Sequence, residues 1–350
     1  MTVEEPTAVP HGAVAASRPP ATLAEVAHLA GVSLATASRV LTGSARVRPQ
    51  TREKVEQAIR RVGYVRNRAA RAASRPQTGS VALVVCEDSA KVFAEPFFAR
   101  ILRSVGKAAA AAGLQHVLLT LEPSGDYRRL SRYLHTGAVD GVLFASIHNR
   151  PDFDFSSLGL PLVLCGRPMS GAERLSYVDA DNVEGSRKAV RYLLDHGRVA
   201  VATIAGPPDM SPGVDRLLGY REVMTEVGRF DPGMVAYGDF GRQAAEHAVT
   251  RLLDHRPKLD AVFAASDLMA AGAIRALRRC GRRVPDDVAV IGFEDSALAR
   301  HTDPRLSTIH QPVDAMADRM VRELLGLITD PGRAPSHTVM PTELVRRESA

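Results

Sequence analysis

Apolar residues in the first part of the chain recur at the spacing of a helix. Four of them fall at the i, i+3, i+4 and i+7 positions of one helix face, namely Leu23, Val26, Ala27 and Ala30. Thr22 precedes this stretch and Glu25 follows three residues later, which is the pattern of a capping box at a helix start. Gly31 predicts the end of the helix, because glycine adopts the left-handed conformation that closes many helices.

Two further helices are predicted directly after the first. Ser33 can cap a helix over residues 34–41, and a third helix is expected from residue 49 or 50 to residue 62, ended by Gly63. Their apolar stripes consist of Ala37, Val40 and Leu41, and of Val55, Ala58, Ile59 and Val62. Two helices separated by three residues form a helix-turn-helix, although spacing alone leaves an ordinary helical hairpin open.

From residue 79 onward, short apolar runs alternate with helical stretches. The runs are typical of buried strands and cover residues 81–86, 116–121, 139–145, 162–165, 200–205, 259–265 and 288–293. Helices with one apolar face lie between nearly all of them, for example over residues 97–112, 183–196, 243–255 and 268–279. The alternation predicts a parallel α/β body in two lobes. Because ligands of open parallel sheets bind beyond the carboxyl ends of the strands, we expect a site in the cleft between the lobes.

Length and composition restrict the classes of protein. The 350 residues suggest two or three domains, and a content of 45% hydrophobic and 24% charged residues is typical of globular proteins. The longest apolar runs fall far short of the ~20 residues that span a bilayer. The acidic start with its prolines does not resemble a secretory signal, and residues 1–20 are expected to form a disordered tail. We therefore expect a cytoplasmic protein without membrane contact.

The three cysteines, Cys86, Cys165 and Cys280, are far apart and show no CxxC or Cys/His ligand spacing. They are expected to be buried thiols rather than parts of a disulfide framework or a zinc site. The sequence predicts no metal and no cofactor.

The positive charge is concentrated at one end of the chain. Residues 1–75 contain 12 Lys and Arg against 5 Asp and Glu, whereas residues 76–350 contain 33 against 34. Eleven of the twelve basic residues are arginine, whose planar guanidinium suits phosphates and guanine edges. This asymmetry favours a polyanion-binding segment joined to a neutral body, with a solvated basic helix face as the alternative.

The helical segment also carries a specific motif. Its marks are Val26-Ala27, Ala30-Gly31-Val32-Ser33, Thr36, Ser38-Arg39-Val40-Leu41, Thr51-Arg52 and Gly63-Tyr64, with Asn67, Ala70 and Arg71. With these marks, residues 22–72 resemble, almost residue for residue and without a gap, the DNA-binding headpiece of the LacI/GalR family of bacterial transcription regulators. The resemblance implies a headpiece over residues 21–64 that binds double-stranded operator DNA.

A recognition helix places its first turns against base edges in the major groove. In this sequence those turns offer Leu34, Ala35 and Arg39. Arg39 can donate two hydrogen bonds to guanine, whereas the other two offer only apolar contact. Short hydroxyl side chains at helix starts suit phosphate oxygens, and four are expected there: Thr22, Ser33, Thr36 and Ser38. For Ser33, plain N-capping is the alternative.

The expected linker, residues 65–78, contains an alanine-rich and arginine-rich stretch that is too short to be a stable helix alone. The resemblance implies a hinge helix that folds on DNA and inserts a leucine into the minor groove. Here Arg66 stands where the family usually has proline, and Ala73 where it has the leucine, so a strong wedge is not expected. The DNA contacts implied for this segment are Asn67, Arg68, Arg71 and Ala73.

The body resembles the effector domain of the same family, which is similar to periplasmic sugar-binding proteins of type I. Its marks include Pro96-Phe97-Phe98, Asp140-Gly141, Gly166-Arg167-Pro168, Asp181-Asn182, Arg216 with Gly219-Tyr220, Ser266-Asp267, residues 290–295 and residues 344–349. The resemblance implies an effector-binding and dimerisation domain over residues 79–346, with three crossings between lobes near 180, 309 and 337. The N-lobe would contain residues 79–179 and 310–336, and the C-lobe residues 180–309 and 337–346.

The resemblance also implies a set of effector contacts: Ser146, Arg167, Arg216, Phe240, Ser266, Asp267, Glu294 and Gln311. Carboxylates and a guanidinium can bind vicinal hydroxyls, and an aromatic face can stack on a sugar ring, so the set suits a mono- or oligosaccharide. Three alternatives stay open: Asp267 as a helix N-cap, Phe240 as lobe core and Arg167 in an ion pair. Ser266 and Glu294 depart from the asparagine and aspartate usual in the family.

An enzyme is the main rival class, and no catalytic residue is expected. The sequence has no phosphate-binding GxxxxGK[ST], GxSxG or HExxH motif, and no GxGxxG follows the first strand. A set such as Asp267, Glu294 and Asp295 cannot be assigned to catalysis by spacing alone. A binding protein that delivers sugar to a transporter would share the body, but the basic headpiece and the missing signal argue against it.

The expected mechanism combines these parts. A homodimer, with a tetramer as an open alternative, would bind a near-palindromic operator, and a ligand in the cleft would relieve repression. The alternative is a cytoplasmic sugar-binding protein in which the ligand acts as a co-repressor and activates DNA binding.

Overall fold

The structure is a computed structural model that describes residues 22–41, 47–62, 77–150 and 153–350. The chain divides into two compact units, residues 1–71 and residues 72–350. The expected tail and the hinge residues Asn67, Arg68, Arg71 and Ala73 lie outside the described residues. In the described ranges, no helix is long and apolar enough to cross a membrane.

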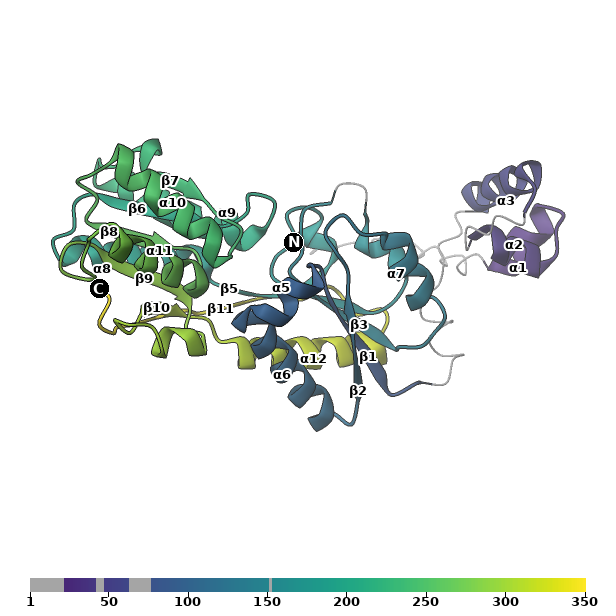
Figure 1. Cartoon of the computed structure of the whole chain (residues 1–350). Coiled ribbons are helices and arrows are strands. Elements are labelled where there is room, and N and C mark those ends of the chain that lie inside the picture. Colours follow the sequence, from purple (N-terminus) through teal and green to yellow (C-terminus); the bar gives the residue numbers. More distant parts are fainter. Residues whose placement is uncertain (1–21, 42–46, 63–76, 151–152) are drawn as a thin grey trace, which may run out of the picture. The chain divides into compact units, whose positions relative to one another are not determined.

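The first unit contains the three predicted helices, α1 (Leu23–Leu29), α2 (Leu34–Leu41) and α3 (Pro49–Val62) (Figure 1). The capping box is confirmed, because Glu25 N donates to Thr22 Oγ1 and Thr22 N donates to the Glu25 carboxylate. Gly31 has a φ of +63° and closes α1 in a Schellman motif, since Val32 N donates to the carbonyl of Ala27. The predicted stripes meet in one core formed by Val26, Ala27, Ala30, Ala37, Val40, Val55 and Ala58.

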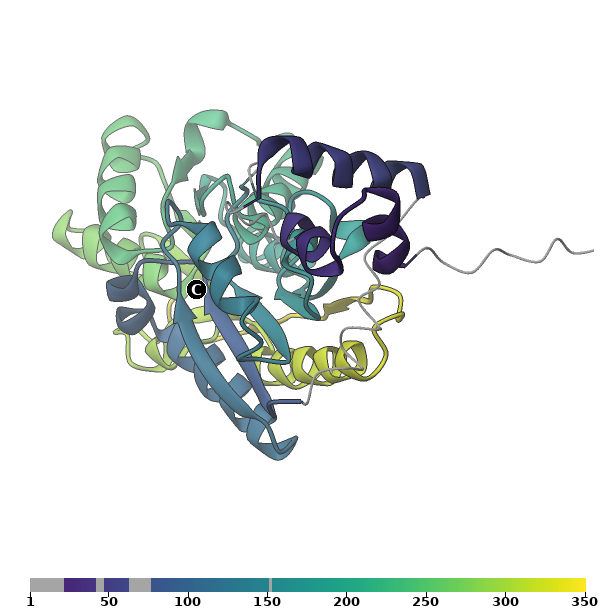
Figure 2. The ribbon, with the colours of Figure 1, turned by 90° about the vertical axis from the view of Figure 1, so that its right-hand side faces the viewer.

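The N-lobe of the second unit is built on a six-stranded parallel sheet in the order β11-β5-β4-β3-β1-β2 (Figure 1). Its strands are β1 (Ser80–Val85), β2 (Gln115–Thr120), β3 (Gly141–Ala145), β4 (Leu162–Cys165), β5 (Ser176–Ala180) and β11 (His337–Met340). The helices of this lobe are α5 (Ser89–Ala94), α6 (Pro96–Ala111), α7 (Tyr127–Leu134) and α12 (Val313–Thr329). Helices α6 and α12 pack on one face of the sheet, as Figure 2 also shows, and α7 packs on the other.

The side chains of β1 show why this sheet is covered on both faces. Val81, Leu83 and Val85 belong to the core beneath α6 and α12, whereas Ala82 and Val84 belong to the core beneath α7. Successive side chains of a strand point to opposite faces, so a strand buried on both sides must be apolar throughout.

The C-lobe is built on a second six-stranded sheet in the order β12-β10-β9-β8-β6-β7, in which only β12 runs antiparallel to its neighbour. Its strands are β6 (Val201–Ala205), β7 (Val235–Tyr237), β8 (Ala261–Ala264), β9 (Ala289–Glu294), β10 (Ser307–His310) and β12 (Glu343–Val345). Its helices are α8 (Asn182–Asp195), α9 (Ser211–Glu226), α10 (Arg242–His255) and α11 (Asp267–Arg279). Helices α8 and α9 cover one face, and α10 and α11 the other. Short 3₁₀ helices lie at Phe155–Leu158, Ala172–Arg174, Pro232–Met234 and Ala297–Arg300.

The chain passes between the two sheets three times, as expected, but the last crossing lies later than expected. Residues 337–340 were expected in the C-lobe, whereas they form β11 and pair in parallel with β5 of the N-lobe. The crossing therefore falls between Met340 and Glu343, where β12 begins in the other sheet. The hydrogen bond from Asp181 N to the Met340 carbonyl extends this pairing to the end of β11.

The expectation of three buried thiols is wrong for Cys280. Cys86 is buried, Cys165 is half-buried, and Cys280 is exposed at the C-terminal end of α11. Among the residues that the structure describes, no group of three or more His, Cys, Asp or Glu side chains is arranged to hold a metal ion.

Candidate functional site

Helix α2 separates an apolar inner face from an exposed outer face. Ala37 and Val40 are buried in the core of the first unit, whereas Leu34, Ala35 and Arg39 are exposed. Leu34, at the start of the helix, is 54% exposed, although contact of a large apolar side chain with water is unfavourable. The three residues predicted to contact base edges therefore share the outer face.

The hydroxyl side chains at the helix starts act as caps in the free protein. Ser33 Oγ accepts a hydrogen bond from Thr36 N at 3.1 Å and lies 2.9 Å from Thr36 Oγ1, so the capping alternative for Ser33 is confirmed. Thr22 caps α1 in the same way. Contacts of these hydroxyls and of the exposed Ser38 with phosphates remain predictions.

A cavity with about 720 Å³ of empty space lies between the lobes of the second unit. It is formed at the carboxyl ends of the strands of both sheets, as the sequence predicted. Six of the eight predicted effector contacts line it: Ser146, Arg167, Arg216, Phe240, Glu294 and Gln311.

Arg216 from α9 is the most thoroughly held side chain of the cavity wall. It is 3% exposed and donates from Nε to Asn182 Oδ1 at 2.8 Å, from Nη1 to the Ala265 carbonyl at 2.6 Å and from Nη2 to Gln311 Oε1 at 3.3 Å. Its guanidinium also stacks on the ring of Phe293, 3.7 Å from the centroid. Burial lowers the pKa of Arg216 to about 10, so the group stays charged at neutral pH.

Glu294 ends β9 and lines the cavity with a strained backbone. Its φ is +113° and that of Asp295 is +51°, values that cost about 1–3 kcal/mol each for a residue other than glycine. Burial raises the pKa of Glu294, and the neighbouring Asp267 raises it further, against the opposite effect of Arg216. A carboxyl in this setting can either donate or accept a hydrogen bond with a ligand hydroxyl.

The N-lobe contributes carboxylates that the sequence analysis missed. Glu87 lies two residues beyond the end of β1, Glu95 lies between α5 and α6, and Asp179 lies in β5. All three line the cavity. Burial raises the pKa of Glu95 to about 7. The position of Glu87 beyond the carboxyl end of the first strand was the signal that could have found it.

Phe240 lines the cavity and also packs against the core formed by α10 and α11, so the lobe-core alternative is confirmed and its contact with an effector remains a prediction. Its φ of +69° is also in the left-handed region. Ser146, with a φ of +57°, donates to Glu87 Oε1 at 2.8 Å, which fixes both residues at the cavity wall.

Direct contacts join the lobes beside the cavity. Arg167 Nη2 lies 2.7 and 2.8 Å from the two carboxylate oxygens of Asp215 on α9, which confirms the ion-pair alternative for Arg167. His148 Nε2 lies 3.3 Å from Glu87 Oε1 of its own lobe, and His148 Nδ1 lies 2.7 Å from Asp209 Oδ2 of the C-lobe. Asn149 N also donates to the Asp209 carbonyl at 2.7 Å.

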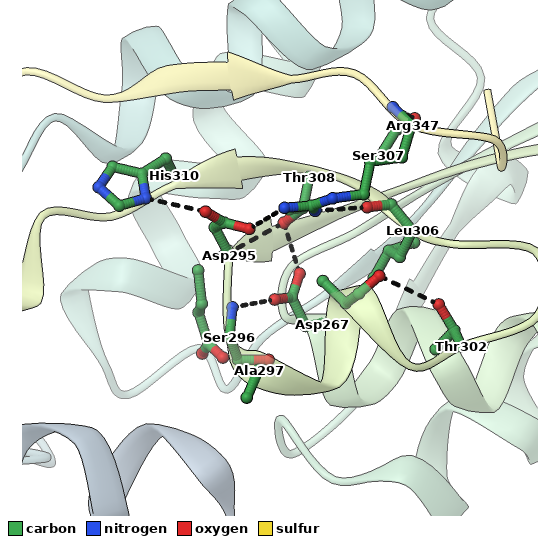
Figure 3. A network of polar contacts seen from close by, with 12 residues as sticks. Asp267, Asp295, Ser296, Ala297, Thr302, Leu306, Ser307, Thr308, His310 and Arg347 are labelled. Atoms are coloured by element: carbon green, nitrogen blue, oxygen red, sulfur yellow. Dashed lines mark hydrogen bonds and ion pairs between the residues drawn. The ribbon is translucent and has the colours of Figure 1, made fainter.

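Ser266 and Asp267 are not among the residues that line the cavity, contrary to the expectation for both. The N-cap of α11 is Ser266, whose Oγ accepts from Met269 N at 3.1 Å, so the capping alternative for Asp267 is also wrong. Asp267 is fully buried and accepts hydrogen bonds from Ser296 N at 2.6 Å and from Thr308 Oγ1 at 2.5 Å (Figure 3).

Comparisons with known proteins match both units. Residues 22–67 match the profile of the bacterial regulatory proteins of the lacI family, and residues 190–350 match a periplasmic binding protein-like domain. The chain is 46% identical over 332 residues to the HTH-type transcriptional regulator CelR of Thermobifida fusca, covering 94% of this chain and 98% of that protein. It is 32% identical over 338 residues to the ribose operon repressor of Escherichia coli K12, covering 94% and 100%.

Solved structures show the same correspondence. A complex of the transcriptional regulator CelR with cellobiose superposes with a TM-score of 0.76 at 46% identity, covering 95% of this chain and 100% of that one. The lac repressor dimer bound to operator and the anti-inducer ONPF gives a TM-score of 0.68 at 24% identity, covering 94% and 99%, which supports the fold.

Proposed function

Because the chain belongs to the LacI family of bacterial regulatory proteins, we propose that it represses transcription by binding a near-palindromic operator as a homodimer, and that a sugar in the interlobe cavity releases it. In this proposal the outer face of α2 reads base edges in the major groove, with Arg39 as the main source of sequence information. The hydroxyls of Thr22, Ser33, Thr36 and Ser38 contact phosphates. The protein acts in the cytoplasm, where it meets the operator.

The observation that carries the effector part is the composition of the cavity wall. The wall combines a buried guanidinium, that of Arg216, with carboxyl groups from both lobes, Glu87 and Glu95 from the N-lobe and Glu294 from the C-lobe, and with the ring of Phe240. Paired donors and acceptors around an aromatic face suit the vicinal hydroxyls and the C–H surface of a sugar. Cellobiose is the first candidate, because a structure with 46% identity contains this disaccharide.

A ligand that touches both lobes can change the angle between them, and an effector acts only through such a difference between two states. The ion pairs Arg167–Asp215 and His148–Asp209 join the lobes beside the cavity, and we call the arrangement that contains them the closed arrangement. We propose that the bound sugar stabilises this arrangement and that DNA affinity falls as a result. A sugar that instead strengthens operator binding would support the co-repressor alternative.

The proposal is tested by fluorescence anisotropy with a labelled duplex recovered by in vitro selection from random sequence. The expected result is tight binding of a near-palindrome and a weakening of this binding by cellobiose, with glucose, maltose and ribose as comparisons. A protein that prefers no duplex over random DNA at low salt would contradict the DNA-binding part, and binding that no sugar changes would contradict the effector part.

The oligomeric state is measured separately by sedimentation equilibrium. A homodimer has twice the 37.6 kDa of the chain, and a tetramer four times that mass. A monomer that binds the full operator would contradict the proposed pairing of two headpieces with two half-sites.

A further inference from the structure

The turn that begins at Glu294 has a conformation that its own residues do not favour. Glu294 and Asp295 are consecutive, neither is glycine, and both have φ in the left-handed region, +113° and +51°. Such a backbone persists only where the surrounding structure holds it. The contacts of residues 294–296, which we call the Glu294 turn, are therefore informative.

The first support comes from the start of α11. The Asp267 carboxylate accepts from Ser296 N at 2.6 Å and from Thr308 Oγ1 at 2.5 Å, so one buried side chain ties the turn to β10 (Figure 3). Gly292 in β9 leaves space for this carboxylate, because a Cβ at that position would lie 2.6 Å from Asp267 Oδ1. Burial raises the pKa of Asp267 to about 7, and its hydrogen bonds from Thr308 and Ser296 oppose this effect by stabilising the carboxylate.

The second support comes from the last residues of the chain. Arg347, just after β12, donates from Nη2 to Asp295 Oδ1 at 2.5 Å and from Nη1 to the Leu306 carbonyl at 2.8 Å. The other carboxylate oxygen of Asp295 lies 3.1 Å from His310 Nδ1 (Figure 3). The side chains of Asp295 and Arg347 are 7% and 13% exposed, so this ion pair is screened little by water.

The turn held in this way has two outward contacts. The Glu294 side chain lines the interlobe cavity, and its carbonyl accepts from Arg100 Nη1 of α6, in the N-lobe, at 3.2 Å. One residue thus meets the cavity and the opposite lobe at once.

We propose that Asp267 and Arg347 are positioning residues of the effector site, which hold the Glu294 turn from both sides so that Glu294 meets a bound sugar and the N-lobe together. The effector part of this inference rests on the proposed function, whereas the support of the turn does not. Asp267 thus acts through the turn, although the resemblance placed it against the ligand. The C-terminal segment also acts on the site indirectly, because its Arg347 holds the Glu294 turn.

Substitutions of the full-length protein separate these roles. Arg347→Met removes the ion pair but keeps the aliphatic stem. Asp267→Asn removes the charge but can still accept from Ser296 N and donate to Thr308 Oγ1. Arg305→Met is the matched control, because Arg305 pairs with Glu348 on the same C-terminal segment, is 62% exposed and does not contact the Glu294 turn.

The first measurement needs no ligand. Hydrogen exchange followed by mass spectrometry should show peptides that cover residues 292–298 exchanging about tenfold faster in Arg347→Met than in the wild type, which corresponds to about 1.4 kcal/mol of lost local stability. The control should match the wild type. Asp295→Asn added to Arg347→Met should change little more, because both substitutions break one ion pair.

The second measurement is calorimetric titration with cellobiose, alongside operator binding without sugar. Arg347→Met should weaken cellobiose binding about tenfold while operator affinity stays within about twofold. Asp267→Asn should lower the pKa of the Glu294 carboxyl, followed by NMR, because a neighbouring negative charge is removed. The control Arg305→Met, which removes an exposed guanidinium paired with Glu348, should leave this titration unchanged.

The outcomes are distinguishable. Unchanged exchange of residues 292–298 in Arg347→Met, or an unchanged Glu294 titration in Asp267→Asn, overturns the inference. If the wild type binds no cellobiose, the proposed effector is wrong, while exchange and titration still decide whether the two residues hold the turn. If Arg347→Met does not fold, Asp267→Asn decides through the Glu294 titration.

Discussion

Arg39 lies on the outer face of α2 with Leu34 and Ala35, and it is the member of this trio that can read a base edge with two hydrogen bonds. We expect Arg39→Ala to remove most discrimination between operator and random DNA, at a cost of about 1–3 kcal/mol, and to leave weak, salt-sensitive binding. Anisotropy titrations of the operator and a scrambled duplex at two salt concentrations measure the discrimination between the duplexes and the salt dependence of the remaining binding. Arg61→Ala, an exposed arginine on α3, is the control, and equal discrimination by Arg39→Ala and the wild type would refute the assignment.

Arg216 uses its planar guanidinium to bind three partners on three different segments, Asn182, Ala265 and Gln311. Lysine keeps the charge but cannot reproduce this geometry. We expect Arg216→Lys to weaken cellobiose binding at least about tenfold, which is about 1.4 kcal/mol, and to leave operator affinity without sugar unchanged.

Calorimetry and anisotropy check these two expectations for Arg216→Lys. Thermal unfolding reports whether the fold survives, because the substitution leaves buried acceptors without partners. Arg191→Lys in α8, whose ion pair with Glu226 is exposed, is the matched control. Loss of operator binding by a folded Arg216→Lys protein would contradict a role confined to the effector.

At the residue level, the sequence predicted the cavity better than the contacts within it. Six of the eight predicted residues line the cavity, because they were carried over residue by residue from the effector domain that the body resembles. Asp267 was misplaced, since the sequence does not show that its carboxylate turns beneath the Glu294 turn. Glu87 and Glu95 were missed because single carboxylates near strand and helix ends are common, and only the folded chain shows which ones meet.

At the level of elements, α8 and α9 approach each other closely at Gly219. A Cβ there would lie 2.3 Å from the Val183 carbonyl and 2.8 Å from Ser186 Cβ, which are atoms of a packed helix that cannot move aside. Alanine gains about 1 kcal/mol in helix propensity, but overpacking costs about 1–3 kcal/mol, so we expect Gly219→Ala to destabilise the protein. Urea unfolding followed by circular dichroism measures the change.

The control for Gly219→Ala is Gly106→Ala in α6, where a new Cβ would meet only the His116 side chain, at 2.9 Å. His116 is exposed and can rotate away, so this substitution should be neutral or stabilising. Equal destabilisation by both substitutions would contradict the close approach of α8 and α9.

Elements with a strong local pattern were predicted, and those that depend on pairing were not. The three helices of the first unit and the strands β1, β2, β3, β4, β6, β8 and β9 were recognised from caps and apolar runs. Strand β7 has three residues, and β11 alternates between exposed and half-buried positions, so neither has an apolar run. The pairing of β11 with β5, 160 residues earlier, decides where the last crossing falls.

At the level of the whole molecule, the second unit consists of two lobes, each a sheet covered by helices, and the contacts that join the lobes differ in chemistry. The Arg167–Asp215 contact is an ion pair of a guanidinium with a carboxylate, whereas the contact of His148 with Asp209 is an ion pair only when the imidazole is protonated. The Arg100 contact with the Glu294 carbonyl adds a neutral acceptor. The closed arrangement of the lobes should therefore depend on pH through His148.

Burial by itself would lower the pKa of His148, but its hydrogen bonds to Glu87 and Asp209, together with their charges, outweigh burial and raise it. Burial by itself would raise the pKa of Glu87, but its hydrogen bonds from His148, Ser146 and Lys91 and the charge of Lys91, at 3.1 Å, outweigh burial and lower it, so this carboxylate stays charged near neutral pH. When the lobes separate, His148 loses Asp209 and returns toward its ordinary value. The imidazolium thus stabilises the closed arrangement fully below about pH 6.5, and this contribution disappears as the pH rises through the raised value.

We therefore expect cellobiose binding to weaken between about pH 6 and pH 8.5, because the sugar binds the closed arrangement, which loses the contribution of the imidazolium as the pH rises through the raised pKa of His148. His148→Gln should remove this dependence of the cellobiose affinity on pH. Glu95 and Glu294, whose pKa values are raised to about 7 and about 8, line the same cavity, so the comparison is repeated with Glu95→Gln and with Glu294→Gln in both proteins. Calorimetric titrations at five pH values measure the slopes, and parallel profiles for His148→Gln and the wild type would show that the lobes do not sense pH through this contact.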